Sequence, residues 1–202
     1  MIHQKNSFQT QLASKFAVIF SCFAIATVTT TTAAAIAQNA TARIFNVKGL
    51  QVGIATFVQT PLGVKISLEV QNLKAGEHMV HIHEYGKCNA PEFKTSGKHF
   101  DPTNHDEMDH MNHHEHESMP MMHEKHEEAK HQPAGDLPNI IVKQDGKGTL
   151  TAMLSELSLG TGQNSLLKQG GTSILIHAGA NGKSTIPNVD YKTRIACGII
   201  RK

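Results

Sequence analysis

Short stretches of alternating or β-branched residues recur along the chain, and turn-forming sequences separate them. Two separators are TPLG and QDGKG, and in the second Asp145-Gly146 supplies the positive φ that a tight hairpin needs. No segment has a convincing amphipathic helical pattern, and the one helix-compatible segment, near 121–131, is polar all round. Eight short strands therefore predict an all-β protein, an antiparallel sandwich or flattened barrel. The stretches are ARIFNV, VGIATFVQT, VKISLEV, HMVHIHEY, NIIVKQ, GTLTAML, SILIHAG and TRIACGII.

Two connections between these stretches are too long for a hairpin. One runs from Gly86 to about Pro138, and the other from Ala178 to about Lys192. Each follows a strand-like stretch that ends in histidine residues. Long irregular loops inside a compact domain are usually functional or disordered. We therefore expect two functional loops beside the strands that bear histidine.

The first 37 residues have the pattern of a secretory signal peptide. Lysines precede an apolar run of about 13 residues, FAVIFSCFAIATV, and small residues with an A-x-A site follow it. A membrane span needs about 20 apolar residues, so we expect no membrane anchor. Cys22 lies in the run, but bulky Phe20 before it disfavours a lipoprotein signal. We predict a signal peptide over residues 1–37 and a single exported domain over residues 38–202.

Two cysteines, Cys88 and Cys197, remain in the exported part. In an exported chain of this size they favour one disulfide that closes a very long loop. Two unrelated buried thiols are the alternative. Trp is absent and aromatic residues make up 5% of the chain, so the core must consist of Val, Ile, Leu and Ala.

Charge is unevenly distributed along the chain. Residues 105–131 hold eight acidic residues against two lysines, whereas the rest of the chain from residue 38 has 15 Lys and Arg against nine Asp and Glu. A basic body can indicate nucleic-acid binding, but an exported protein rarely meets nucleic acid. Attraction of a small anion is the better explanation, so we expect no nucleic-acid partner.

The stretch HMVHIHEY has histidines at alternate positions, 81 and 83. In a strand, residues i and i+2 point to the same face, so His81 and His83 project together while Val80 and Ile82 face the core. Two imidazoles on one face are a natural pair of metal ligands because both rings can converge on one ion. A pair of solvated or hydrogen-bonded histidines is the alternative for this pattern alone.

Three further features accompany this pair. His99 lies early in the first long loop in GKHFDP, His177 ends the apolar run ILIH, and Arg194 stands three residues before Cys197 in TRIACG. With these residues the chain resembles copper–zinc superoxide dismutase of the bacterial, exported type. The matching motifs occur in the family's order and cover essentially all of residues 42–202. They are HMVHIHEYG, GKHFDP, AGDLPN, LIHAGA and TRIACGII.

The resemblance implies an eight-stranded Greek-key barrel or sandwich and a copper site. Matched residue by residue, the copper ligands are His81, His83, His99 and His177. Imidazole suits both copper and zinc, so the copper assignment comes from the resemblance. In the family the counterpart of His99 is deprotonated and bridges copper to zinc.

The resemblance also implies an activity, the dismutation of superoxide to dioxygen and hydrogen peroxide. Copper would cycle between Cu(II) and Cu(I), and His99 would deliver a proton to the product. Arg194 would hold the superoxide anion, since its fixed charge and planar donor fork suit an anion; an ordinary exposed arginine is the alternative. Lys183 and Lys192 would help to attract the anion. The implied location is the periplasm, and bacterial members are monomers or homodimers.

The zinc pattern of the family does not carry over cleanly. Asp136 fits the aspartate of this pattern, but Pro133 stands where a histidine ligand is expected, and the nearest histidine is His131. The middle ligand is ambiguous between His105 and His110, which straddle the expected separation from the bridging histidine. We predict an altered zinc site that uses the bridging histidine, Asp136 and, provisionally, His131 and His105.

Three other positions are interpreted through the resemblance. Cys88 and Cys197 match an intrachain disulfide that ties the metal loop to the last strand. His78 matches a structural histidine that anchors a loop by hydrogen bonds and is not a ligand. Asn181 departs from the family, which usually has an aspartate there that links the two metal sites through hydrogen bonds.

Residues 104–131 form an insertion in the metal loop that holds eight histidines and five methionines. Thioether sulfur selects Cu(I), and imidazole takes Cu(II) and zinc, so we interpret this insertion as a copper donor for the neighbouring site. A flexible acidic loop is the alternative. The insertion also keeps open a second function for the whole protein, a periplasmic copper or zinc buffer or metallochaperone on a dismutase fold.

Overall fold

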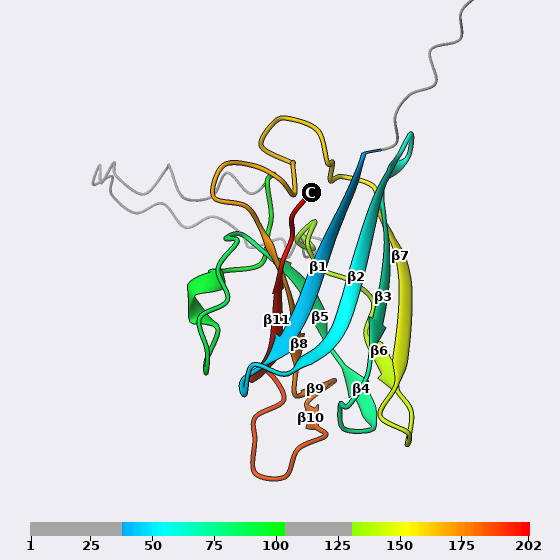
Figure 1. Cartoon of the computed structure of the whole chain (residues 1–202), viewed down its shortest axis with the longest axis vertical. Coiled ribbons are helices and arrows are strands. Elements are labelled where there is room, and N and C mark those ends of the chain that lie inside the picture. The colour runs from blue at the N-terminus through cyan, green and yellow to red at the C-terminus, as the bar shows by residue number, and fades with distance from the viewer. Residues whose placement is uncertain (1–37, 104–130) are drawn as a thin grey trace, which may run out of the picture. The chain divides into compact units, whose positions relative to one another are not determined.

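The computed structural model describes residues 38–103 and 131–202 (Figure 1). The predicted signal peptide, and the insertion up to residue 130 with His105 and His110, lie outside the described residues. Within the described ranges, no helix is long and apolar enough to cross a membrane.

The described chain consists of strands and one short 3-10 helix, η1, at Lys94–Ser96 in the first long loop. The first group of strands is β1 (Asn39–Asn46), β2 (Gln51–Thr60), β3 (Gly63–Val70), β4 (Gly76–His78) and β5 (Val80–His83). The second group is β6 (Ile140–Val142), β7 (Gly148–Leu154), β8 (Ser173–His177), β9 (Gly179–Ala180), β10 (Lys183–Ser184) and β11 (Arg194–Ile199).

Nine of these strands form one antiparallel sheet in the order β4-β6-β7-β3-β2-β1-β11-β8-β5. The two ends of this order, β4 and β5, are consecutive along the chain and are separated only by Met79. The sheet therefore curls round until its two edges meet, which makes a nearly closed barrel (Figure 1). Closure matters because it removes the exposed strand edges of an open sheet.

The core follows from the alternation of side chains along each strand. In β3, Val64, Ile66, Leu68 and Val70 are buried, while the residues between them are exposed. The buried cluster is mostly aliphatic, as expected from the composition, with Phe57 as its largest fully buried side chain. This aliphatic filling makes the barrel a rigid support for the loops at its wall.

All eight predicted stretches are strands, so the prediction of an antiparallel all-β barrel is confirmed. One stretch, HMVHIHEY, divides into two strands because its halves pair differently: β4 pairs with β6, and β5 pairs with β8. The β9–β10 hairpin inside the second long loop was not anticipated from the sequence.

Candidate metal centre

Four imidazoles from three parts of the chain converge at the barrel wall. His81 and His83 lie on β5, and His177 ends the neighbouring strand β8. His99, in the first long loop, forms a bridge with His83 that brings the loop alongside β5. Within the described residues these four histidines make a group whose potential ligand atoms all lie within 4.8 Å of one another.

Backbone carbonyls orient two of these rings. His83 Nδ1–H donates to the carbonyl of Gly97 over 2.9 Å, and His177 Nδ1–H donates to the carbonyl of Lys192 over 2.6 Å. These bonds place the remaining proton-free nitrogen, Nε2, towards the group in each ring. His177 Nε2 lies 3.1 Å from His81 Nδ1. Two ring nitrogens this close, aimed at each other, are suited to share one cation.

His83 Nε2 is the nitrogen that most clearly fits a metal ligand. Among the described side chains it is a buried nitrogen without a hydrogen-bond partner. An orphaned polar atom in a protein interior costs free energy, roughly 1–3 kcal/mol. A metal ion bound at this nitrogen would remove that cost.

Burial keeps the imidazoles uncharged. Desolvation, followed by repulsion from His99, lowers the pKa of His81 from 6.5 to about 2. Desolvation also lowers the pKa of His83 to about 3, although its hydrogen bond to Gly97 acts in the opposite direction. The pKa of His177 is lowered by burial as well. At neutral pH these rings therefore present free lone pairs, the form in which histidine binds a metal.

His99 has neighbours on both sides of its ring. Its Nδ1–H donates to the carboxylate of Asp136 over 2.7 Å, and the ring centroid lies 4.0 Å from that of His81. Asp136 is itself positioned by a bridge to His81 and by its backbone N–H, which donates to the Pro133 carbonyl over 2.9 Å. One ring nitrogen thus faces the histidine group, and the other faces a carboxylate through its proton.

Arg194 starts β11, in register with His177. Its guanidinium donates to the carbonyl of Phe93 over 2.9 Å, to Ser96 Oγ over 3.0 Å and to the carbonyl of Gly97 over 2.8 Å. Burial lowers its pKa, but the group stays cationic. Because a guanidinium has five N–H donors, some remain for an anion.

The other predicted zinc ligands are placed differently. His131 Nε2–H donates to the carboxylate of Asp101 over 2.7 Å, and among the described residues it does not join Asp136 in a metal-binding group. Asp101 also accepts bonds from Thr103. The zinc assignment of His131 stays a prediction, as does that of His105.

Two positions interpreted through the resemblance have clear partners. His78 is fully buried, with Nδ1 2.7 Å from the His177 carbonyl and Nε2 2.8 Å from the Lys74 carbonyl. Asn181 Nδ2 donates to Glu77 over 3.0 Å, and Asn139 donates to the same carboxylate over 2.8 Å. An amide–carboxylate link therefore occupies the place where an aspartate was expected.

The predicted disulfide between Cys88 and Cys197 is present. It packs with Phe93 and Leu175 in a small apolar cluster apart from the main core. The bond ties the first long loop to β11, which also carries Arg194.

Sequence reasoning missed the residues that hold the arginine. Phe93, Ser96 and Gly97 bind it, mostly through backbone atoms, which leave no mark in a list of side-chain types. The one usable sequence signal was that residue 97 is a glycine, which the structure explains by its φ of +81°, a conformation that favours glycine.

These features define a class of protein, a β-barrel with an imidazole-rich metal centre and an anchored cation beside it. Imidazole donors suit copper and zinc, whereas magnesium and calcium prefer oxygen ligands. The orphaned His83 Nε2 and the neutral rings fit such an ion.

Comparisons with known proteins give the family. The family model for copper/zinc superoxide dismutase (SODC) matches residues 51–200. Superoxide dismutase [Cu-Zn] 1 of Aquifex aeolicus is 35% identical over 166 residues, which cover 79% of this chain and 86% of the relative. Superoxide dismutase [Cu-Zn] of Deinococcus radiodurans is 36% identical over 164 residues, which cover 76% and 79%. The chain therefore belongs to the copper/zinc superoxide dismutase family.

Solved structures agree on the fold. A double mutant of a SOD-like protein from Bacillus subtilis matches with a TM-score of 0.58 and 28% identity, covering 79% of this chain and 95% of that one. The Cu/Zn superoxide dismutase from Brucella abortus matches with a TM-score of 0.54 at 21% identity, covering 81% and 100%. At the level of the family, the predictions of a superoxide dismutase type of enzyme with copper and zinc as cofactors are confirmed.

Proposed function

We propose that this chain catalyses the dismutation of superoxide, in which two superoxide anions and two protons give one dioxygen and one hydrogen peroxide. The main support for the proposal is that the Gly97 carbonyl accepts two hydrogen bonds, one from Arg194 and one from His83. This carbonyl holds an anion-binding cation and a metal-binding imidazole in one fixed relation. Catalysis by positioning and preorganised charge depends on such an arrangement.

Copper held by His81, His83, His99 and His177 would supply the one-electron redox chemistry, cycling between Cu(II) and Cu(I). Arg194 binds the superoxide anion through the N–H donors that its three backbone and side-chain acceptors leave free. Lys183 and Lys192 lie in the second long loop and add to the positive field that attracts the anion.

His99 is proposed to carry a proton to the peroxide product. Its Nδ1 is held by Asp136 over 2.7 Å, so the ring keeps its orientation while the other nitrogen gains or loses a proton. The same ring is proposed as the bridge to zinc, with Asp136, His131 and His105 completing that site. The 36% exposure of the His99 side chain gives protons from water a path to it.

The alternative function, a periplasmic metal buffer or metallochaperone, is less well supported. Such a protein needs the four imidazoles but has no use for a guanidinium fixed beside them by three hydrogen bonds.

We also propose that residues 1–37 are a signal peptide that directs residues 38–202 to the periplasm. The insertion at 104–131 would donate copper to the centre. Comparing export with and without residues 1–37, and copper uptake with and without residues 108–129, tests these two proposals separately.

The dismutase proposal is tested by following superoxide decay after rapid mixing with copper- and zinc-loaded protein. Decay should be fast with the original protein and return to near the uncatalysed rate with His81→Gln. A matched variant, Lys65→Gln on the exposed face of β3, should keep the original rate. Equal decay with His81→Gln and Lys65→Gln would contradict the proposal and favour a binding protein.

A further inference from the structure

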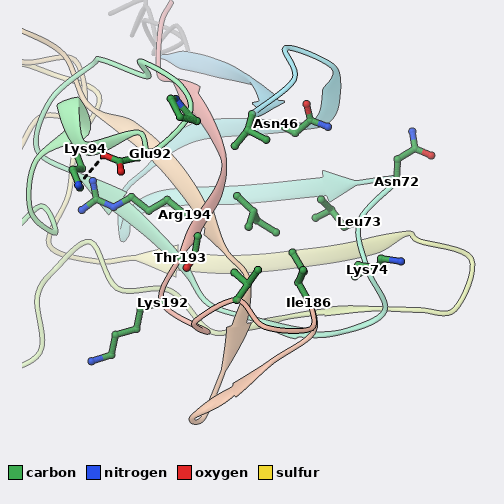
Figure 2. A pocket seen from close by; sticks show the side chains of 14 residues that line it. Asn46, Asn72, Leu73, Lys74, Glu92, Lys94, Ile186, Lys192, Thr193 and Arg194 are labelled. Carbon is green, nitrogen blue, oxygen red and sulfur yellow. Dashed lines mark ion pairs between the residues drawn. The ribbon is translucent and has the colours of Figure 1, made fainter.

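A cavity lies beside the metal centre. It has a volume of about 740 Å³ and is formed by the β1–β2 turn, the loop after β3, the start of η1, and the second long loop with the beginning of β11 (Figure 2). This volume falls within the roughly 300–1,000 Å³ typical of small-molecule sites. Its apolar lining comes from Val47, Leu73, Pro91, Ile186, Val189 and Ile195. None of the four clustered histidines lines it.

The charged residues of the cavity are mostly cationic. Lys74, Lys94, Lys192 and Arg194 contribute to the lining against one acid, Glu92. Glu92 is paired with Lys94 over 2.7 Å, so the remaining cations have no acid among the lining residues. Figure 2 shows Leu73, Lys74 and Ile186 among the side chains that line the cavity. An apolar interior with a positive rim is complementary to a ligand that has an aliphatic body and an anionic head.

The lining is joined to the metal centre through backbone carbonyls. The carbonyl of Lys192 accepts the Nδ1–H of His177 over 2.6 Å. The carbonyl of Lys74 lies 2.8 Å from His78 Nε2, and His78 Nδ1 lies 2.7 Å from the His177 carbonyl. Two lining residues on different loops therefore both act on one predicted ligand, His177. The Lys192 bond holds the His177 ring, and the Lys74 route holds the His177 backbone through His78, so a molecule that moved either loop would act on the position of that histidine.

We propose that this cavity binds a medium-chain carboxylate, and that its occupation is transmitted to His177 through Lys192 and Lys74. The binding part does not require a functioning copper centre, although Arg194 belongs to both the cavity lining and the proposed anion site, whereas the transmission part rests on the proposed metal centre. A second copy of the chain is a poorer occupant, because a two-fold interface would bring the same cationic rim face to face with itself.

Binding is tested by isothermal titration of the purified copper- and zinc-loaded protein with octanoate. Saturable binding of one octanoate is expected, with octanol at least about tenfold weaker because it lacks the charge. Octyltrimethylammonium should not bind. Octanol binding as tightly as octanoate, or no saturable octanoate binding, would overturn the proposal. Dimerisation that masks the cavity, seen by sedimentation, would overturn it in favour of a second copy.

Two variants test whether octanoate binds in this cavity. Val47 is 44% exposed, so Val47→Glu adds a carboxylate to the cavity wall with little risk to folding and should weaken octanoate binding at least about tenfold. Leu62→Glu is the matched control, because Leu62 is 74% exposed in the β2–β3 turn and does not line the cavity. It should bind octanoate like the original protein. Equal binding by both variants would show that the ligand binds elsewhere.

Transmission is tested by NMR of the imidazole nitrogens in the reduced, diamagnetic copper–zinc form. Octanoate should shift the His78 and His177 ring signals, and Val47→Glu should remove the shift at the same octanoate concentration. Octanoate binding that leaves both rings unshifted would overturn the transmission part. Superoxide decay is measured separately in the ligand-free samples. If the ligand-free original protein did not accelerate superoxide decay, that result would contradict the dismutase proposal but not the octanoate site.

Discussion

At the scale of single residues, Gly97 connects the anion-binding guanidinium to a metal-binding imidazole. Its carbonyl accepts one bond from Arg194 and one from His83. Its φ of +81° is the left-handed conformation that favours glycine, and a Cβ there would collide with Glu84 and with Tyr85. The position of the cation therefore depends on a backbone conformation that other residues adopt only with strain.

Replacing Arg194 should separate anion binding from metal binding. Arg194→Met removes the charge and all three hydrogen bonds, and a charge-assisted bond is worth about 1.5–3 kcal/mol. We expect kcat/KM for superoxide to fall about tenfold or more, with Arg194→Lys intermediate because it keeps the charge but not the fork. Copper stoichiometry should stay unchanged. Arg43→Met, at an exposed position of β1, is the control; an equal loss in it would refute a specific role.

The buried imidazoles predict how the stability of the metal-free protein depends on pH. Folding lowers the pKa of His81 to about 2 and that of His83 to about 3, whereas both titrate near 6.5 in the unfolded chain. Between these values the unfolded state binds more protons, so stability falls as pH falls below about 6.5. Each ring contributes at most about 1.4 kcal/mol per pH unit.

Urea unfolding with a chelator at pH 7, 6, 5 and 4 measures this dependence. His81→Gln does not titrate, so its free energy of unfolding should decline less steeply with falling pH. Identical slopes for the two proteins over this range would show that the pKa of His81 is the same in the folded and the unfolded chain, which contradicts the lowered value.

At the scale of elements, the histidine group depends on three segments held edge to edge. The Ile82 N–H donates to the Gly135 carbonyl, the Gly135 N–H to the Phe100 carbonyl, and the Phe100 N–H to the Ile82 carbonyl, each over 2.8 Å. This ring of backbone bonds joins β5 to the segments that carry His99 and Asp136. Gly135 fits because a Cβ there would lie 2.7 Å from the Ile82 oxygen and 2.8 Å from the Phe100 oxygen.

Gly135→Ala should accordingly damage the centre without touching any predicted ligand. The added methyl group meets backbone atoms that cannot rotate away, and overpacking of this kind costs about 1–3 kcal/mol. We expect a lower midpoint of thermal unfolding and weaker copper binding, measured by competition with a chelator. Gly160→Ala is the matched control, since nothing lies within 4 Å of its added Cβ. Full copper affinity in Gly135→Ala would refute the structural role given to this close approach.

The strands were predictable from the sequence because alternation and turn residues are local properties. The pairing of strands is not local, so HMVHIHEY was expected as one strand although its halves lie at opposite ends of the sheet order. The four clustered histidines were anticipated from strand periodicity and motif order. The carbonyls of Gly97, Lys192 and Phe93 were not, because a backbone acceptor has no residue-type signature.

At the scale of the whole molecule, the Cys88–Cys197 bond closes a loop with a sequence separation of 109 residues. On the chain-entropy account, a loop of this length stabilises the folded state by roughly 4–5 kcal/mol. The bond also packs against Phe93, whose carbonyl accepts a hydrogen bond from Arg194. Its loss should therefore affect both global stability and the position of the cation.

The double variant Cys88→Ser/Cys197→Ser should unfold at a markedly lower urea concentration and lose kcat/KM through a less well-held Arg194. His81 and His83 belong to β5, which pairs with β8, and the backbone bonds between Ile82 and Phe100 still hold the segment that carries the bridging histidine, so copper should still bind. Ser67→Ala, on the exposed face of β3, is the control for a substitution as such and should match the original protein. A double variant with unchanged activity but lower stability would confine the disulfide to a structural role. Equal stability of all three proteins would mean that the native contacts of the 88–97 segment hold the loop without it.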